Sequence, residues 1–159
     1  MEVIIIKIYP MLNIVLFQPE IAENLGSIIR TAACFEAVIH IVDPCGFPFV
    51  SKRIKLAAMD YFDKVEIIRY KSFADFLDKN QNADIILMTT KSDKALSETI
   101  ILPDSFFLFG QESSGVPDKV HNMCAKRAKI PINSKTRSLN LAVSVAITAY
   151  AATNVRAPL

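Results

Sequence analysis

Cysteine, glycine and long apolar runs are scarce in this chain, and each scarcity excludes a class of protein. The three cysteines, Cys34, Cys45 and Cys124, are scattered among 159 residues without the Cys-x-x-Cys spacing of a metal knuckle or redox pair. We therefore expect reduced cytosolic thiols and no bound metal. Nowhere do about 18 apolar residues follow one another, which predicts a cytoplasmic protein without a membrane span. The four glycines draw attention to places where the backbone needs unusual freedom.

Linkers, repeats and a strong net charge are absent as well. No Pro-rich or Gly/Ser-rich stretch divides the chain, and 52% hydrophobic with 21% charged residues indicates one compact domain. The net charge of +2 neither requires nor excludes a nucleic-acid partner. The apolar run that begins at Val3 is broken by Lys7 and resembles no signal peptide. Because Met11 looks like a natural beginning, we expect residues 1–10 to be an N-terminal extension or an upstream start, and residues 11–159 to form the domain.

Short apolar runs alternate with helical patterns along the chain. The runs that we expect to form buried strands are 12–17, 38–42, 65–68, 85–89, 106–109 and 128–132. Apolar residues at helical spacing predict helices over 25–33, 73–77 and 139–150. The apolar stripe of the last helix consists of Leu139, Val143, Ala146, Ile147 and Tyr150. This alternation predicts a single α/β domain with a mostly parallel sheet flanked by helices.

Three polar segments lie where such a fold binds ligands. They are 24–30, 109–116 and 137–141, and the first two contain three of the four glycines. Ligands of parallel sheets bind beyond the carboxyl ends of the strands, where loops lead into helices. If the strands 106–109 and 128–132 are neighbours, the second and third segments share a pocket.

The first two segments allow a plain structural interpretation beside a functional one. Asn24 could cap a helix whose polar face is simply solvated, or Arg30 on that face could grip a phosphate or an anionic transition state. The loop from Gly110 to Gly115 could be a tight turn with Glu112 in solvent. It lacks the lysine of a phosphate-binding loop and the spacing of a dinucleotide fingerprint, so the functional alternative is close approach to a small ligand.

The third segment opens the last apolar stretch. Ser138 is expected to be the N-cap of a helix that begins at Leu139. Packing alone does not call for Asn140 in so apolar a helix, so its amide is expected to satisfy a ligand or a neighbouring loop.

Taken in order, the three segments resemble the three motifs of the SPOUT class of RNA methyltransferases, in its SpoU-like 2′-O-methyltransferase branch. They read Asn24-Leu-Gly26-Ser-Ile-Ile-Arg30, Leu108-Phe-Gly110-x-Glu112-x-x-Gly115-Val116, and Ile130-Pro131-Ile132 followed by Ser138-Leu-Asn140-Leu. The resemblance extends over about 11–150. The stretches Asn13-Ile-Val-Leu-Phe-Gln-Pro-Glu20, Asp43-Pro-x-Gly46-Phe47 and Leu87-Met-Thr-Thr-Lys91 resemble the small members that act on the wobble nucleotide of tRNA, position 34, a cytidine or uridine.

The resemblance implies a fold, a cofactor and a set of site residues. The fold would carry a C-terminal trefoil knot and form a homodimer, with tRNA as substrate. The cofactor would be S-adenosyl-L-methionine, converted to S-adenosyl-L-homocysteine as its methyl group passes to a ribose 2′-hydroxyl without a metal. Its binding residues would be Met88, Thr89, Gly110, Ile130, Ile132, Ser138 and Leu139. The catalytic residues would be Arg30, Glu112, Ser138 and Asn140.

Contacts with RNA are expected at Asn24, Arg30, Arg53 and Arg137, the last two within basic clusters. After Asn140 the chain continues Leu-Ala-Val, where wobble enzymes often have Ser-Asn after the leucine. Methylation of another tRNA or ribosomal RNA position is therefore an alternative. Two further alternatives are a noncatalytic RNA-binding module of the same fold and a small-molecule enzyme on an ordinary doubly wound sheet.

Overall fold

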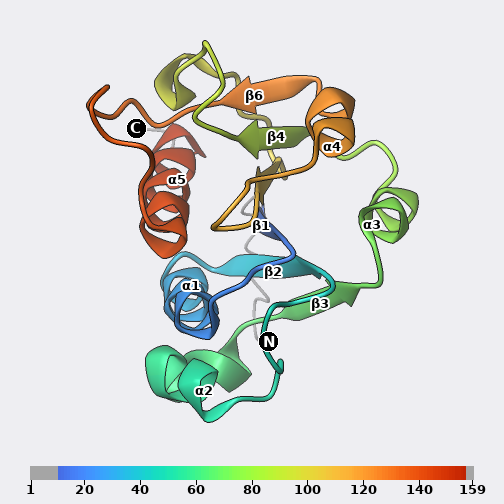
Figure 1. The fold of residues 1–159 in the computed structure, drawn as a ribbon, viewed down its shortest axis with the longest axis vertical. Coiled ribbons are helices and arrows are strands. Elements are labelled where there is room, and N and C mark those ends of the chain that lie inside the picture. Colours follow the sequence, from blue (N-terminus) through green and yellow to red (C-terminus); the bar gives the residue numbers. More distant parts are fainter. Residues whose placement is uncertain (1–10, 157–159) are drawn as a thin grey trace, which may run out of the picture.

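The computed structural model describes residues 11–156, and for residues 155 and 156 it describes the backbone alone. The interpretation of residues 1–10 as an extension lies outside the described residues. Six parallel strands form one sheet in the order β3-β2-β1-β5-β4-β6 (Figure 1). The strands are β1 (Leu12–Phe17), β2 (Ala37–Val42), β3 (Ile67–Tyr70), β4 (Ile85–Met88), β5 (Phe106–Phe109) and β6 (Lys126–Ala128).

Helices cover both faces of this sheet. The α-helices are α1 (Ala22–Cys34), α2 (Lys52–Ala58), α3 (Phe73–Lys79), α4 (Asp118–Met123) and α5 (Leu141–Arg156), and the 3-10 helices are η1 (Met59–Lys64) and η2 (Leu96–Glu98). α1, α2 and α5 contribute to the larger apolar cluster, whereas α3 and α4 contribute to the cluster on the opposite face (Figure 1). Within residues 11–156, no helix combines the length and apolarity needed to cross a bilayer.

The central strand β1 shows how the sequence positions the core. All six of its residues are buried, as expected for an apolar run in a parallel sheet. Ile14 and Leu16 face the larger cluster, while Val15 and Phe17 face the other. The predicted single α/β domain with a parallel sheet flanked by helices is confirmed.

The two edge strands lie elsewhere than predicted. The expected strand 65–68 is observed two residues later, because pairing with β2 continues through Arg69 to Tyr70. The expected strand 128–132 begins instead at Lys126 and ends at Ala128. The observed strands include Arg69 in β3 and Lys126 and Arg127 in β6, which the predicted ranges leave out. Edge strands tolerate such residues because their side chains reach water, as in the ion pair of Arg69 with Asp43.

The C-terminal helix turns a different face to the core than predicted. Val145, Ala149 and Ala152 are buried against the sheet and α1. The predicted stripe members Val143, Ile147 and Tyr150 are 46%, 39% and 61% exposed. The prediction was wrong because the helix is apolar on most of its circumference, so spacing alone could not identify the inner face. The side of α5 that carries Ala149 and Ala152 packs against the sheet and α1, whereas the larger side chains of Val143, Ile147 and Tyr150 lie at the surface.

Candidate active site

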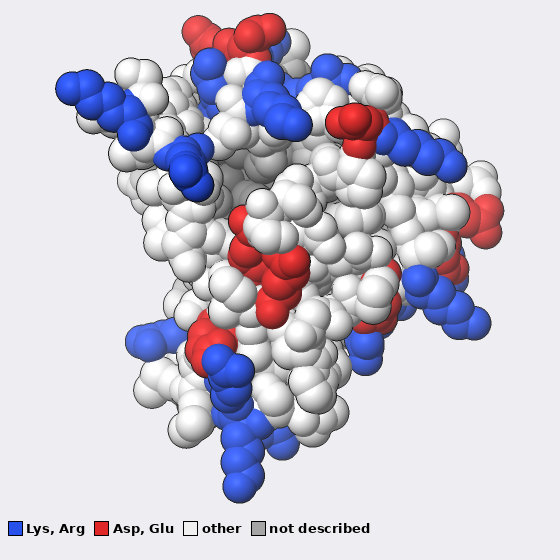
Figure 2. Space-filling model, in the orientation of Figure 1, with Lys and Arg blue, Asp and Glu red and all other residues white. Residues whose placement is uncertain are grey.

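A cavity of about 530 Å³ lies beyond the carboxyl ends of β4 and β5. This volume is within the range of small-molecule sites. Its walls are built from 87–91, 109–116 and 137–141, together with Ile21, Asn24, His121, Ile130, Ile132 and Ser144. All seven residues expected to bind a cofactor line this one cavity. In Figure 2 a hollow is visible on this face, with basic side chains on its upper rim and acidic side chains below it.

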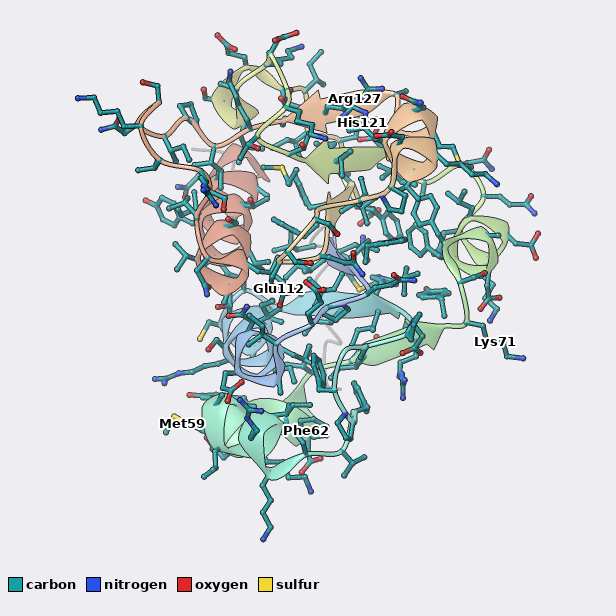
Figure 3. The ribbon with its side chains drawn as sticks, viewed as in Figure 1. Met59, Phe62, Lys71, Glu112, His121 and Arg127 are labelled. Atoms are coloured by element: carbon teal, nitrogen blue, oxygen red, sulfur yellow. The ribbon has the colours of Figure 1, made fainter. Side chains whose placement is uncertain are left out.

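Glu112 ties the loop after β5 to the start of α1 (Figure 3). Its Oε2 accepts a hydrogen bond of 2.8 Å from the backbone N–H of Glu20. Its Oε1 accepts from the backbone N–H of Ile21 at 3.2 Å and from Nδ2 of Asn24 at 3.1 Å. In return, the Glu20 carboxylate accepts from the backbone N–H of Ser113 at 2.8 Å. The carboxylate thus satisfies N–H groups at the positive end of a helix, and the alternative of Glu112 lying free in solvent is wrong.

Asn140 connects the third segment to the first. Its Nδ2 donates to Oδ1 of Asn24 at 2.9 Å. Its Oδ1 accepts from the backbone N–H groups of Ala142 and Val143 at 2.9 and 3.3 Å. Asn140 is therefore the N-cap of α5, which begins at Leu141, and the prediction that Ser138 caps a helix from Leu139 is wrong. Asparagine caps helices as well as serine does, and here it stands next to the first turn. The Asn140 amide was expected to satisfy a ligand or a neighbouring loop, and its observed partner Asn24 lies instead on helix α1.

Glycine is required in the loop between these contacts. Gln111 and Gly115 exchange two backbone hydrogen bonds, of 2.8 and 2.9 Å, and so close a tight turn. Gly115 has a φ of +70°, and a Cβ atom on Gly110 would overlap the backbone of Gly115. The turn leaves Gly110 and Glu112 on the cavity wall.

The predicted RNA-binding residues divide into two groups. Asn24 and Arg137 line the cavity. Arg30 lies outside it and is exposed on α1, near η1. The pKa of Asp60 on η1 is lowered mainly by its hydrogen bond from Lys64, and the nearby charge of Arg30 adds a small contribution. Arg53 also lies outside the cavity and forms a 2.6 Å ion pair with Glu23.

None of the three cysteines lines the cavity. Cys34, Cys45 and Cys124 are all free. Burial and the neighbouring Asp43 raise the pKa of Cys45 to about 12, which keeps this thiol protonated at neutral pH. Among the described residues, no group of three or more His, Cys, Asp or Glu side chains is placed to hold a metal ion.

The sequence interpretation did not single out Ile21 or His121, which both line the cavity. His121 on α4 lines the wall, and its buried Nε2 has no hydrogen-bond partner among the residues that the structure describes. A lone histidine on a short helix carries no sequence signal of its own. The apolar walls from Leu87, Phe109 and Ile130 and the polar groups of Asn24, Ser138 and Asn140 suit a ligand with an aromatic base and a polar end. These features fit S-adenosyl-L-methionine.

Known proteins resemble the chain over nearly its full length. A model of the SpoU rRNA Methylase family matches residues 11–150. A tRNA (cytidine(34)-2′-O)-methyltransferase of Beijerinckia indica is 36% identical over 134 residues, which cover 83% of this chain and 84% of that protein. A solved structure concerned with the 2-OH methylation of C/U34 on tRNA is 37% identical, with a TM-score of 0.87 and coverage of 91% of this chain and 95% of that one.

More distant structures share the fold. An AdoMet-bound rRNA methyltransferase from Sinorhizobium meliloti is 24% identical and has a TM-score of 0.85 over 95% of this chain and 60% of its own. The family match spans the three polar segments that meet at the cavity. The chain belongs to the SpoU rRNA Methylase family.

Proposed function

We propose that the protein transfers a methyl group from S-adenosyl-L-methionine to the ribose 2′-hydroxyl of the wobble nucleotide of tRNA, a cytidine or uridine at position 34. The observation that carries this proposal is the hydrogen-bonded chain Glu112–Asn24–Asn140, which joins all three polar segments at one cavity. The names of the relatives that cover most of this chain give the substrate and the position. A tRNA substrate implies a cytoplasmic enzyme.

The cofactor would be held at the carboxyl ends of β4 and β5. We assign its binding to Met88, Thr89, Gly110, Ile130, Ile132, Ser138 and Leu139, which line the cavity. When bound, the cofactor supplies a methyl group already activated by a sulfonium, so a metal ion is not required. The protein's own tasks are then to align the 2′-hydroxyl and to stabilise the charge that develops on it.

Two of the expected catalytic residues act by holding others in place. The Glu112 carboxylate accepts hydrogen bonds from the start of α1. The Asn140 amide donates to Asn24 and accepts from the first turn of α5. Ser138, exposed on the cavity wall, is free to face substrate or cofactor. We do not assign Arg30 as the base, because a guanidinium offers hydrogen-bond donors and no acceptor. We assign it to the phosphate next to the target ribose and to the developing alkoxide. Near-normal turnover of Arg30→Lys at saturating tRNA and cofactor would contradict this role.

A second copy of the chain would complete the site. Val143, Ile147 and Tyr150 form an exposed apolar stripe on α5, of the kind that protein interfaces cover. Arg30 lies outside the cavity of its own chain, so a homodimer that covers the stripe could bring Arg30 from one copy to the cavity of the other. Ile147→Asp should give a folded monomer in sedimentation equilibrium and lose activity. A dimer of unchanged stability would contradict this interface.

We also infer that the C-terminal part is threaded as a trefoil knot. In support, Lys129 exchanges backbone hydrogen bonds with Lys94 and Leu96 directly after β6. The chain then returns to α5, which packs on α1. An experimental structure in which 129–140 passes outside the loop 89–105 would contradict the knot.

Methyl transfer from labelled cofactor to tRNA, followed by mapping of the modified ribose, tests the proposed function. We expect label at position 34, and none with Asn140→Ala. Label at another tRNA or ribosomal RNA position would favour the alternative target. Binding of tRNA and S-adenosyl-L-homocysteine without any transfer would favour a noncatalytic module.

A further inference from the structure

Met59 is an exposed apolar residue in a strained backbone conformation. It follows the last residue of α2 and has a φ of +56° and a ψ of −131°, which residues with a side chain rarely adopt. Its side chain is 56% exposed, although methionine is usually buried. Strained residues cluster at ligand-binding and active sites, because elsewhere nothing compensates for their cost in stability. The position therefore calls for a functional explanation.

Both flanks of Met59 are anchored, which holds the strained backbone in place. Ala58 before it is fully buried in the larger apolar cluster, and Phe62 after it packs against the same cluster. Asp60, which follows Met59, forms a 3.0 Å ion pair with Lys64 one turn further on. Figure 3 shows Met59 and Phe62 on opposite sides of α2. The anchoring directs Met59 to the surface while Ala58 and Phe62 stay in contact with the core.

The close packing of α2 on α1 brings Met59 next to Arg30. A Cβ atom on Gly26 of α1 would overlap both side-chain and backbone atoms of α2, so a larger residue would push the two helices apart. Arg30 lies one turn after Gly26 on the same side of α1. The charge of Arg30 reaches Asp60, the residue after Met59, and α1 also packs on η1. The glycine of the first polar segment thus places Met59 beside the guanidinium of Arg30.

The surface around Met59 carries unpaired basic side chains. Lys52 and Lys55 are exposed on α2, and their spacing places them on the same face as Met59. Arg30, Lys52 and Lys55 take part in none of the ion pairs within residues 11–156. In Figure 2, basic side chains project from the lower end of the molecule, where α2 lies. Unpaired cations around an exposed apolar residue suit single-stranded RNA, which presents phosphates and the apolar faces of its bases.

The thioether of Met59 suits the face of a nucleobase. Its sulfur is polarisable and makes favourable contacts with aromatic rings, and its unbranched chain adapts to rings of different shape. Every base has such a face, so the contact accepts cytidine and uridine alike. On the basis of the proposed function, in which Arg30 holds the phosphate next to the target ribose, we infer that Met59 packs against the base of the wobble nucleotide. Met59 is thus a substrate-binding residue that steadies the nucleotide while its 2′-hydroxyl reacts.

Methionine NMR on the full-length chain tests this contact directly. The chain has five methionines, Met1, Met11, Met59, Met88 and Met123. Met59→Leu assigns the ε-methyl signal of Met59. On titration with an anticodon stem–loop RNA we expect this signal to move upfield, because a methyl group over a base lies in its ring current, and the Met123 signal to stay. S-adenosyl-L-homocysteine alone should move the signal of Met88, which lines the cavity, and leave that of Met59 in place.

The outcomes separate the inference from the proposed function. If the RNA binds and wild type methylates position 34 of tRNA while the Met59 signal stays, the inference is overturned and the proposed function stands. If the chain neither binds nor methylates tRNA, the proposed function fails, and the inference with it. A shift of the Met59 signal on raising the protein concentration without RNA would assign the residue to contact with a second copy, and would overturn the inference.

Matched variants separate the side chain from the strain. Met59→Gly removes the side chain and relieves the backbone, so we expect it to melt about 3 °C above wild type and to bind tRNA about fivefold more weakly. Met59→Leu keeps the apolar volume and should retain most of the tRNA affinity. Ile100→Ala is the control, at an apolar residue that is 69% exposed and lies outside the cavity, and should bind tRNA like wild type. Undiminished tRNA binding and methylation by Met59→Gly would overturn the inference, since a merely structural methionine predicts that result.

An RNA without the base at position 34 identifies the partner of Met59. We expect an anticodon stem–loop with an abasic ribose there to bind wild type more weakly, and to lose little further affinity in Met59→Gly, because the two changes remove the same contact. Stem–loops with cytidine or uridine at position 34 should lose equal affinity in Met59→Gly. Fully additive losses for the abasic RNA would overturn the contact with the wobble base.

Discussion

The role of Glu112 as a brace can be separated from a chemical role by one isosteric change. In the wild-type protein, the backbone N–H of Glu20 donates to the Glu112 carboxylate at 2.8 Å. In Glu112→Gln the amide oxygen can still accept from Ile21 and Asn24, but the NH₂ group faces the N–H of Glu20 and cannot accept from it. One charge-assisted hydrogen bond is lost, as is a negative charge at the N-terminus of α1. Such a bond contributes about 1.5–3 kcal/mol and the charge about 0.3–1 kcal/mol. Because Glu112 is half-buried and water can reach it, we expect a loss of about 2 kcal/mol.

Urea denaturation followed by far-UV circular dichroism measures this loss, since the chain has no tryptophan. Glu20→Gln is the matched control: its carboxylate accepts from exposed Ser113, and we expect a loss below about 1 kcal/mol. Hydrogen exchange at the backbone N–H of Glu20 should also speed up in Glu112→Gln. If Glu112→Gln kept wild-type stability and cofactor affinity yet lost methyl transfer, the brace would be the wrong explanation and Glu112 would act on the substrate.

Three further predictions follow from single contacts. Burial lowers the pKa of His40 to about 4 from 6.5, so the unfolded chain binds a proton first as the pH falls. The free energy of unfolding, measured by urea titration, should therefore drop by about 2 kcal/mol from pH 7 to pH 5. An equal drop in His40→Gln would show that His40 is not its cause. Asn140→Ala should lose about 1 kcal/mol of stability with the cap of α5, whereas Asn140→Asp should keep the cap and lose only the bond to Asn24, as measured by thermal melting. Arg137→Gln should weaken tRNA binding and lower its salt slope by about 1 in filter-binding titrations, while Lys79→Gln on the far helix α3 should change neither.

The strands were predictable where burial on both faces makes the residues apolar without interruption. β1 and β5 have the predicted bounds for this reason. The edge strands and the inner face of α5 could not be read in the same way. Charged residues are compatible with an edge strand, so they do not mark where it begins or ends. A helix that is apolar on most of its circumference has no polar face to contrast with a buried one, so the spacing of apolar residues does not identify its inner side. The choice of Ala149 and Ala152 for the core depends on how closely α1 approaches.

The sequence alone determined the fold class and the segments that carry the site, because burial patterns and glycine, asparagine and arginine at turns are local signals. It could not determine which side chains meet. Asn24 forms hydrogen bonds with Glu112, which is 88 positions further along the chain, and with Asn140, which is 116 positions further. Those contacts exist only because the strand order places β5 beside β1 and because α5 packs on α1. The same packing places Arg30 outside the cavity and His121 on its wall. Contacts over such separations depend on how the whole chain packs, so no single segment of the sequence can predict them.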